Sequence, residues 1–220
     1  MIHFLSRLSE IIFGFISPRS RRVLELEALS AEALLNNLPR SEPLKERNTL
    51  ALFDYSHPVV KEIVWEIKYN GNKKLADKIG EILYDVICEE LIDLALFDKW
   101  ERPILVPIPI SDKRRFERGW NQSELLAQAV KARDAEKAFK YLPHQLAKLQ
   151  HTESQTKTSS RSERLHNLTN SMKVLNPSSI AGRCLIILDD VTTTGATFGE
   201  ARRALKEAGA KKILCIAIAH

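Results

Sequence analysis

Cysteine is scarce in this 220-residue chain, which contains only three: Cys88, Cys184 and Cys215. Their odd number and wide spacing argue against a disulfide framework, and no two of them have the spacing of a metal-ligand pair. We therefore expect all three to be buried thiols of a protein that works in a reducing compartment.

Long apolar runs are also missing. No stretch reaches the ~18 apolar residues that a membrane-spanning helix needs. Residues 2–16 are largely apolar, but Arg7 and Glu10 interrupt them, and the small-residue cleavage site of a signal peptide is absent. The sequence thus predicts a cytoplasmic protein without a transmembrane segment.

Neither sign of charge is in large excess. Lys and Arg number 33 against 28 Asp and Glu, which gives a formal net charge of +5. Such an excess suits a phosphate-bearing ligand or a nucleic acid, but it is common in ordinary cytosolic proteins and decides nothing alone. Because 44% of the residues are hydrophobic, the chain can bury a core and global disorder is excluded. Its length predicts one domain with a small appendage.

The appendage is expected at residues 1–48, as a helical N-terminal extension. Apolar residues fall at helical spacing in 2–16, and a second helical stretch follows at 25–36, before a connector with prolines at 39–43. We interpret the first helix as packed on the main domain or on a partner chain, because its face carries little charge. A membrane-surface or docking helix, helped by Arg19, Arg21 and Arg22, is the alternative.

Residues 49–220 have the pattern of an α/β domain. We expect strands at 49–53, 104–110, 184–188 and 212–219, and helices within 57–96, at 121–132 and at 197–208. The turn dipeptide Asn70-Gly71 divides 57–96 into two helices. Strand, helix and strand in succession over 184–219 predict a parallel βαβ unit, so the sheet should be mainly parallel with helices on both faces.

Two acids, Asp189 and Asp190, directly follow the strand predicted at 184–188. That strand is apolar on both faces, so we place it centrally in a covered parallel sheet. The carboxyl end of such a strand is where open α/β sheets bind their ligands. Carboxylates at this position suit the hydroxyl groups of a sugar.

A threonine-rich turn follows the acids and opens the next helix. Its backbone N–H groups and hydroxyls suit a phosphate, its glycine permits a tight turn, and a divalent cation would offset the remaining charge. An ordinary capped helix start explains one Thr or Asp but not the whole set. The segment lacks the Gly-Lys-Ser/Thr of a P-loop and the spaced glycines of a Rossmann turn. We interpret it as a sugar-phosphate site formed by Asp189, Asp190, Thr192, Thr193, Thr194, Gly195, Ala196 and Thr197.

Further motifs accompany this loop. They are Val-Lys-Glu-Ile-Val-Trp-Glu-Ile-Lys-Tyr-Asn-Gly at 60–71, Val-Pro-Ile-Pro-Ile at 106–110, Arg-Gly-Trp-Asn-Gln at 118–122, and the residues Gln155, Thr156, Glu163, Arg164 and Asn167. The acidic loop resembles the signature of type I phosphoribosyltransferases. From about residue 49, the chain resembles the ComF family, which are competence-associated phosphoribosyltransferase-like proteins. Typical members begin with a four-cysteine zinc ribbon, whereas no cysteine precedes Cys88 here, so we expect no zinc site.

The resemblance implies a site for phosphoribosyl pyrophosphate and Mg²⁺. Asp189 and Asp190 would hold the ribose hydroxyls near the magnesium ion, residues 192–197 would hold the 5′-phosphate, and the loop after residues 106–109 would face the pyrophosphate. Arg161 and Arg164 lie in an aperiodic stretch that we interpret as a lid closing over the leaving group. Simple disorder of this stretch is the alternative.

A basic run follows the Val-Pro-Ile-Pro segment and ends just before Trp120. We consider three interpretations: contact with pyrophosphate, contact with single-stranded DNA, and an ordinary solvated helix face. Pyrophosphate contact is favoured because of the position of the run in the chain. Its members are Lys113, Arg114, Arg115 and Arg118, of which Arg118 is the one most expected to act.

No chemical role follows from the sequence for Lys68, Tyr69 or Asn70, although they belong to one of the motifs. The histidines are scattered, and we expect them to be structural or exposed.

Two functional hypotheses remain. The first is a magnesium-dependent phosphoribosyltransferase that acts on a nucleobase or an amine acceptor, as in nucleotide salvage. The second is a ComF-like protein that handles incoming single-stranded DNA during natural transformation, with competence proteins as partners. Its loop would then bind phosphoribosyl pyrophosphate or nucleotide phosphates for structural or regulatory purposes. The resemblance favours DNA uptake as the biological role and leaves turnover and the acceptor open.

Overall fold

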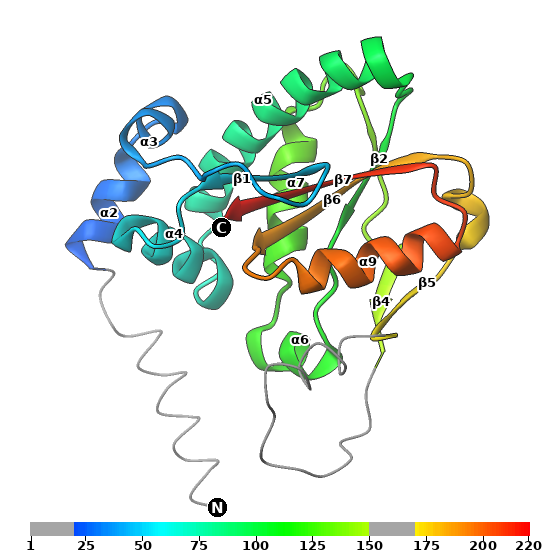
Figure 1. Ribbon diagram of the computed structural model, residues 1–220. Helices are drawn as coiled ribbons and strands as arrows, with labels where there is room; N and C mark the ends of the chain where they lie inside the picture. The colour runs from blue at the N-terminus through cyan, green and yellow to red at the C-terminus, as the bar shows by residue number, and fades with distance from the viewer. Residues whose placement is uncertain (1–19, 150–169) are drawn as a thin grey trace, which may run out of the picture.

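The fold is a five-stranded parallel sheet between two layers (Figure 1). The computed structural model describes residues 20–149 and 170–220, so the predictions for 2–16, Arg19, Arg161 and Arg164 fall outside it. All four strand pairs are parallel. The order across the sheet is β1 (Thr49–Phe53), β7 (Lys212–Ala219), β6 (Cys184–Val191), β2 (Ile104–Pro107) and β3 (Lys140–Tyr141).

The central strands are buried on both faces because alternate side chains enter two different hydrophobic clusters. Ile186 and Leu188 of β6 face the first cluster, whereas Leu185 and Ile187 face the second. The helices of the first layer are α2 (Arg21–Ala28), α3 (Ala31–Asn37), α4 (Pro58–Tyr69), α5 (Lys73–Asp98) and α7 (Gln122–Arg133).

The second layer consists of α9 (Ala196–Glu207) and a small antiparallel hairpin, β4 (Leu146–Lys148) with β5 (Met172–Val174). Figure 1 shows α9 in front of the sheet, with α5 and α7 behind it. The 3₁₀ turn η1 (Pro177–Ser179) leads from β5 towards β6, and α6 (Asp112–Arg118) follows β2. Within the described residues, no helix is long and apolar enough to span a bilayer.

Most of the predicted elements are confirmed. Strands β1 and β7 have the predicted bounds, and 57–96 is divided into α4 and α5 at residues 70–72. The predicted βαβ unit is β6–α9–β7, with its two strands paired in parallel. The prediction of one helix at 25–36 was wrong, because α2 ends at Ala28 and a second helix, α3, begins at Ala31. The break occurs because Ser30 starts a new helix, its Oγ accepting from the Ala33 N–H at 3.0 Å.

The described part of the N-terminal extension shares the main core. Leu26 of α2 and Leu34 of α3 lie in the same hydrophobic cluster as Ile63 of α4 and Ile79 of α5. Helices α2 and α3 therefore stabilise the face of the sheet on which α4 and α5 pack.

Helices α5 and α7 approach each other closely at one glycine. A Cβ added to Gly80 would lie 2.4 Å from the Ala129 Cβ and 3.0 Å from the Ala129 carbonyl carbon. Backbone atoms cannot move aside as the end of a side chain can, so this crossing requires glycine.

We predict that Gly80→Ala lowers the free energy of unfolding by about 1–3 kcal/mol, because the added methyl group overpacks the α5–α7 contact. Gly199→Ala is the matched control. Gly199 is also helical, but nothing lies within 4 Å of its added Cβ. The control should gain about 0.5–1 kcal/mol through helix propensity. Urea denaturation measures both, and equal effects of the two substitutions would contradict the close contact.

Candidate sugar-phosphate site

The two acids predicted from the sequence lie at the carboxyl end of β6, the central strand. Asp189 and Asp190 are 6% and 4% exposed. The Ser123 hydroxyl, from the first turn of α7, donates to Asp189 Oδ1 at 2.8 Å, and the Asp190 N–H donates to the same oxygen at 2.9 Å. One carboxylate is thus fixed by hydrogen bonds from two neighbouring groups.

Asp190 has a counter-ion that the sequence did not reveal. Lys68 Nζ, from the last turn of α4, lies 2.9 Å from Asp190 Oδ2. Burial raises the pKa of Asp189 well above its usual range, and the neighbouring Asp190 raises it further. A cation brought by a ligand would therefore favour the ionised form of Asp189.

The turn after the acids is an open loop at the start of α9. Thr192 is buried, and its N–H donates to the Ala219 carbonyl at 3.0 Å. Thr193 and Thr194 are exposed, so their hydroxyls can reach a ligand. Gly195 precedes α9 with φ of 71°, a left-handed conformation that favours glycine. The N–H groups of the first turn of α9 follow it, and the Ala196 N–H donates to Thr194 Oγ1 at 3.4 Å. Phosphate binding by Ala196 and Thr197 stays a prediction.

Residues 44–48 flank this loop. A Cβ added to Gly195 would lie 3.4 Å from Glu46 Oε1. Arg202 of α9 donates to the Arg47 carbonyl at 3.1 Å and to Thr49 Oγ1 at 2.9 Å. The segment before β1 is thereby fixed beside the phosphate loop.

The Val-Pro-Ile-Pro segment lies directly beside the acids. Pro107 is paired with Leu188 in the parallel register, and the Ile108 N–H donates to the Leu188 carbonyl at 2.9 Å. The Asn121 side chain donates to the Ile108 carbonyl at 2.9 Å and also caps α7. The structure therefore places this loop next to the acid pair.

The Arg-Gly-Trp-Asn-Gln motif connects three parts of the site. Gly119 ends α6 with φ of 84°. Trp120 Nε1 donates to the Ile67 carbonyl at 3.2 Å, and its ring lies against Gly71, where an added Cβ would be 3.1 Å away. Since Asn121 holds the Val-Pro-Ile-Pro loop, the motif fixes α4, α6 and α7 around the acids.

The basic run forms α6, which buries none of its residues. Arg115 pairs with Glu124 at 2.6 Å, and Arg118 donates to Gln122 Oε1 at 3.2 Å. A cavity of about 430 Å³ lies between this segment and the β4–β5 hairpin. Arg115 lines it, whereas Lys113, Arg114 and Arg118 do not.

Lys148 at the end of β4 is a candidate that the sequence reasoning missed. It lines the same cavity. Burial and the neighbouring Arg114 lower its pKa, whereas the negative charge of Asp189 raises it. Only its position just before the aperiodic stretch could have suggested it.

No protein-only metal cage is present among the described residues: no three His, Cys, Asp or Glu side chains come together. Two adjacent buried carboxylates nevertheless fit a Mg²⁺ ion that keeps oxygen ligands from substrate and water. The histidines in the described ranges take no part in such a group.

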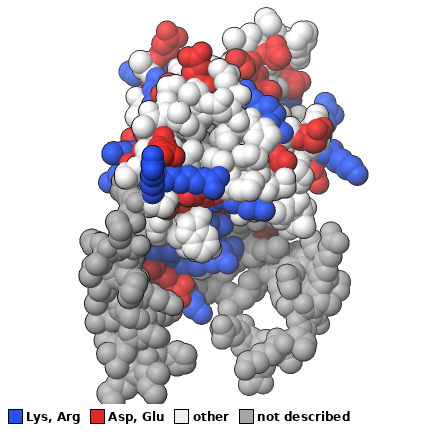
Figure 2. Space-filling view, turned by 90° about the vertical axis from the view of Figure 1, so that its left-hand side faces the viewer, with Lys and Arg blue, Asp and Glu red and all other residues white. Residues whose placement is uncertain are grey.

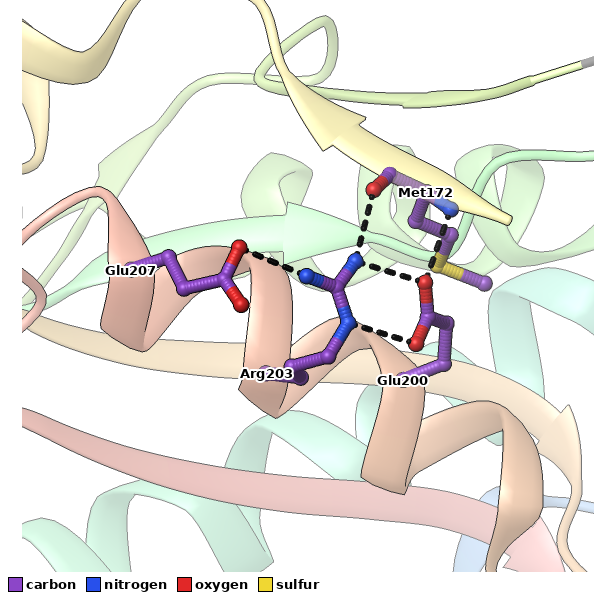
Figure 3. Close-up of polar contacts among 4 residues, drawn as sticks. All are labelled: Met172, Glu200, Arg203 and Glu207. Carbon is purple, nitrogen blue, oxygen red and sulfur yellow. Dashed lines mark hydrogen bonds and ion pairs between the residues drawn. The ribbon is translucent and has the colours of Figure 1, made fainter. Parts of the chain in front are cut away.

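Helix α9 is fixed to β5 by an ion-pair cluster (Figure 3). Glu200 Oε1 accepts from the Met172 N–H at 3.0 Å and from Arg203 Nη2 at 2.8 Å. Arg203 also donates to Glu207 Oε2 at 2.6 Å and to the Met172 carbonyl at 3.1 Å. The cluster therefore holds the hairpin against the helix that begins at the phosphate loop.

Comparison with known proteins agrees with this geometry. A family model described as the phosphoribosyl transferase domain matches residues 132–220. The competence protein ComFC of Bacillus subtilis is 28% identical over 204 residues, which cover 93% of this chain and 76% of the relative. The DNA utilization protein YhgH of Escherichia coli K12 is 27% identical over 183 residues, which cover 80% of this chain and 72% of the relative. ComFC of Streptococcus pneumoniae is 30% identical over 163 residues, which cover 74% of this chain and 64% of the relative.

These relatives and the domain match support a phosphoribosyltransferase-like protein similar to the ComF proteins. Its parallel sheet with helices on both faces is the type I phosphoribosyltransferase-like α/β fold. Among solved structures, the glutamine phosphoribosylpyrophosphate amidotransferase of B. subtilis superposes with a TM-score of 0.39 at 15% identity, over 70% of this chain and 30% of that one. The likeness to ComF proteins rests on the sequence relatives, and the fold rests on the sheet topology and the domain match.

We predict a pH-dependent contribution of Glu200 to stability. Its hydrogen bonds with Arg203 and the Met172 N–H lower its pKa below the usual 4.5, against the opposing effect of burial. A carboxylate with a lowered folded-state pKa stabilises the protein above its unfolded-state pKa, and this stability is lost as the pH falls through the folded-state value. Glu200→Gln should therefore cost about 1–3 kcal/mol at neutral pH, and the difference from wild type should narrow below about pH 4.

Glu207→Gln provides the control, because Glu207 contacts the same arginine from a side chain that is 65% exposed. It should cost about 0.5 kcal/mol or less. Urea denaturation at several pH values measures both variants. A cost for Glu200→Gln that is the same at every pH would contradict the assigned ion-pair role.

Proposed function

We propose that this ComF-like protein binds phosphoribosyl pyrophosphate with Mg²⁺ at the acid pair and the threonine-rich loop. We further propose that its biological role is in DNA uptake. The observation that carries the proposal is the placement of Asp189 and Asp190, which are buried at the end of β6 and directly followed by an open phosphate loop. Sugar hydroxyls donate to carboxylates, and phosphates accept from N–H groups at a helix start. A ribose 5-phosphate meets both requirements in this order.

Each part of the site then has a task. Asp189 and Asp190 accept hydrogen bonds from the ribose hydroxyls, while Ser123 and Lys68 hold the two carboxylates in place. Residues 192–197 bind the 5′-phosphate. A bound Mg²⁺ ion would supply positive charge between the acids and the pyrophosphate oxygens.

The basic helix α6 is suited to a second anionic group. It follows β2, which pairs with β6, so it leaves the sheet at the same edge as the acids. Arg114, Arg115 and Arg118 would hold pyrophosphate or the phosphates of a nucleic acid. Arg161 and Arg164, outside the described residues, remain proposed to close over the leaving group.

A role with DNA is supported by two relatives, which are named a competence protein and a DNA utilization protein. We propose that the protein handles incoming single-stranded DNA in the cytoplasm, together with competence proteins. Single strands bind to positively charged surfaces that follow their backbone. Helix α6 exposes such a surface, since none of its residues is buried.

Pentosyl transfer is the second candidate. It is favoured by the paired register of β2 and β6, which places the Val-Pro-Ile-Pro loop beside the acids, where pyrophosphate would leave. The C1–oxygen bond to pyrophosphate would break as a C1–nitrogen bond to a nucleobase or amine forms. The protein would contribute positioning and charge stabilisation of the leaving group.

The first test is calorimetric titration of phosphoribosyl pyrophosphate with and without Mg²⁺. We expect binding that requires Mg²⁺ and is lost in Asp189→Asn/Asp190→Asn. The matched control is Glu89→Gln/Glu90→Gln, which removes two adjacent carboxylates from α5 and should leave binding unchanged. A well-folded wild type that binds no phosphoribosyl pyrophosphate would sink the proposal, whereas binding followed by pyrophosphate release with an acceptor would establish turnover.

A second test addresses the DNA role through salt dependence. If α6 contacts the backbone of single-stranded DNA, Arg114→Ala/Arg115→Ala removes two phosphate contacts. The plot of log affinity against log salt concentration should then become shallower, its negative slope decreasing in magnitude by about 1.4. Fluorescence anisotropy with a labelled oligonucleotide measures the slope.

Lys211→Ala/Lys212→Ala is the control, because it removes two adjacent cations at the amino end of β7, the opposite edge of the sheet. Its slope should match that of wild type. An unchanged slope in the arginine variant would show that α6 does not contact the strand and would leave pyrophosphate as its expected ligand.

A further inference from the structure

An aromatic stack lies exposed on α4, beside the acid pair. The rings of Trp65 and Tyr69 have centroids 4.2 Å apart at an interplanar angle of 42°. The Arg118 guanidinium of α6 lies over the Tyr69 ring, 4.8 Å from its centroid. We call Trp65, Tyr69 and Arg118 the aromatic platform.

The platform is open to solvent although two of its members are large aromatic residues. Trp65 is 57% exposed and Tyr69 is 42% exposed. Side chains of this size normally contribute to a core or an interface because they bury so much apolar area. Because both rings are exposed, packing in the core does not explain why aromatic residues stand at these two positions.

The docking of α6 on α4 brings the members of the platform together. Trp65 and Tyr69 are four residues apart on α4, so they lie on one side of the helix. Trp120 ties α6 to α4 through its hydrogen bond to the Ile67 carbonyl, and Arg118 is held by Gln122. A rigid stack costs little conformational entropy when a ligand binds to it.

The charges around the platform favour an anionic ligand. Lys61 lies on the same helix, and α6 adds Lys113 and Arg114. Lys68 and Arg115 are already paired with Asp190 and Glu124. The acids of α4 are already engaged: Glu62 pairs with Arg22 at 2.9 Å, and Glu66 accepts from the Asn70 side chain at 2.7 Å. Figure 2 views the molecule from the side that carries α4 in Figure 1, and shows Lys and Arg together with Asp and Glu around exposed uncharged side chains.

We propose that the aromatic platform binds single-stranded DNA by stacking its bases. This inference rests on the DNA role proposed above and names the surface that contacts the bases of the strand. Bases stack on aromatic rings and on arginine whatever their sequence, while basic residues follow the phosphates. Exposed rings, a guanidinium over one of them and the basic residues of α6 combine these two requirements.

The platform adjoins the sugar-phosphate site through one residue. Lys68, the neighbour of Tyr69 in the chain, forms the ion pair with Asp190. A strand on the platform and a ligand at the acids would therefore meet at the last turn of α4. Binding at one site is expected to alter affinity at the other.

The test compares two ligands of about 20 nucleotides, oligothymidylate and an abasic strand with the same backbone. Wild type should bind oligothymidylate about tenfold more tightly, because only this strand offers bases to stack. Trp65→Ala/Tyr69→Ala should bind both strands equally weakly, whereas Trp65→Phe/Tyr69→Phe should keep the preference. Thermal unfolding confirms that each variant is folded.

Phe97→Ala is the matched control, since it removes an 83% exposed ring from the last turns of α5. It should bind both strands as wild type does. A preference for oligothymidylate that persists in Trp65→Ala/Tyr69→Ala would overturn the platform while leaving the DNA role standing. Wild type that binds neither strand would overturn both. Binding of thymidine monophosphate without binding of either strand would show a nucleotide site instead.

Discussion

Two adjacent carboxylates buried at the end of the central strand are the constraint on which the rest of the structure depends. Burial and the neighbouring Asp190 both raise the pKa of Asp189, so its charge needs compensation. Compensation comes from separate elements, with Ser123 on α7 and Lys68 on α4. The acids thereby determine where two helices of one layer must end or begin.

The motifs that mark the family mostly serve this assembly. Trp120 docks α6 on α4, and Asn121 holds the loop beside the acids. These residues position others and need not touch a ligand. Their presence in a chain is therefore evidence for the architecture of the site, whereas the acids and the exposed threonines are the evidence for its chemistry.

Much of the fold and of the central loop could be predicted from the sequence, because strand, helix and turn signals are local. The apolar run at 184–188 and the glycine at 195 each carry their own structural consequence. Lys68 could not be assigned a role, because its partner is more than a hundred residues away in the chain and a lysine in a last helical turn is unremarkable by itself. The platform was missed for the same reason: Tyr69 and Arg118 meet only after α4 and α6 dock.

The tight crossing at Gly80 bears on the site through geometry. Ala129, which Gly80 contacts, and Ser123, which binds Asp189, stand on the same helix, about 9 Å apart along its axis. The spacing between α5 and α7 thus sets how far the serine hydroxyl reaches towards the carboxylate. A change in the width of this helix crossing would therefore alter the hydrogen bond that lowers the pKa of Asp189, without altering any residue that a ligand contacts.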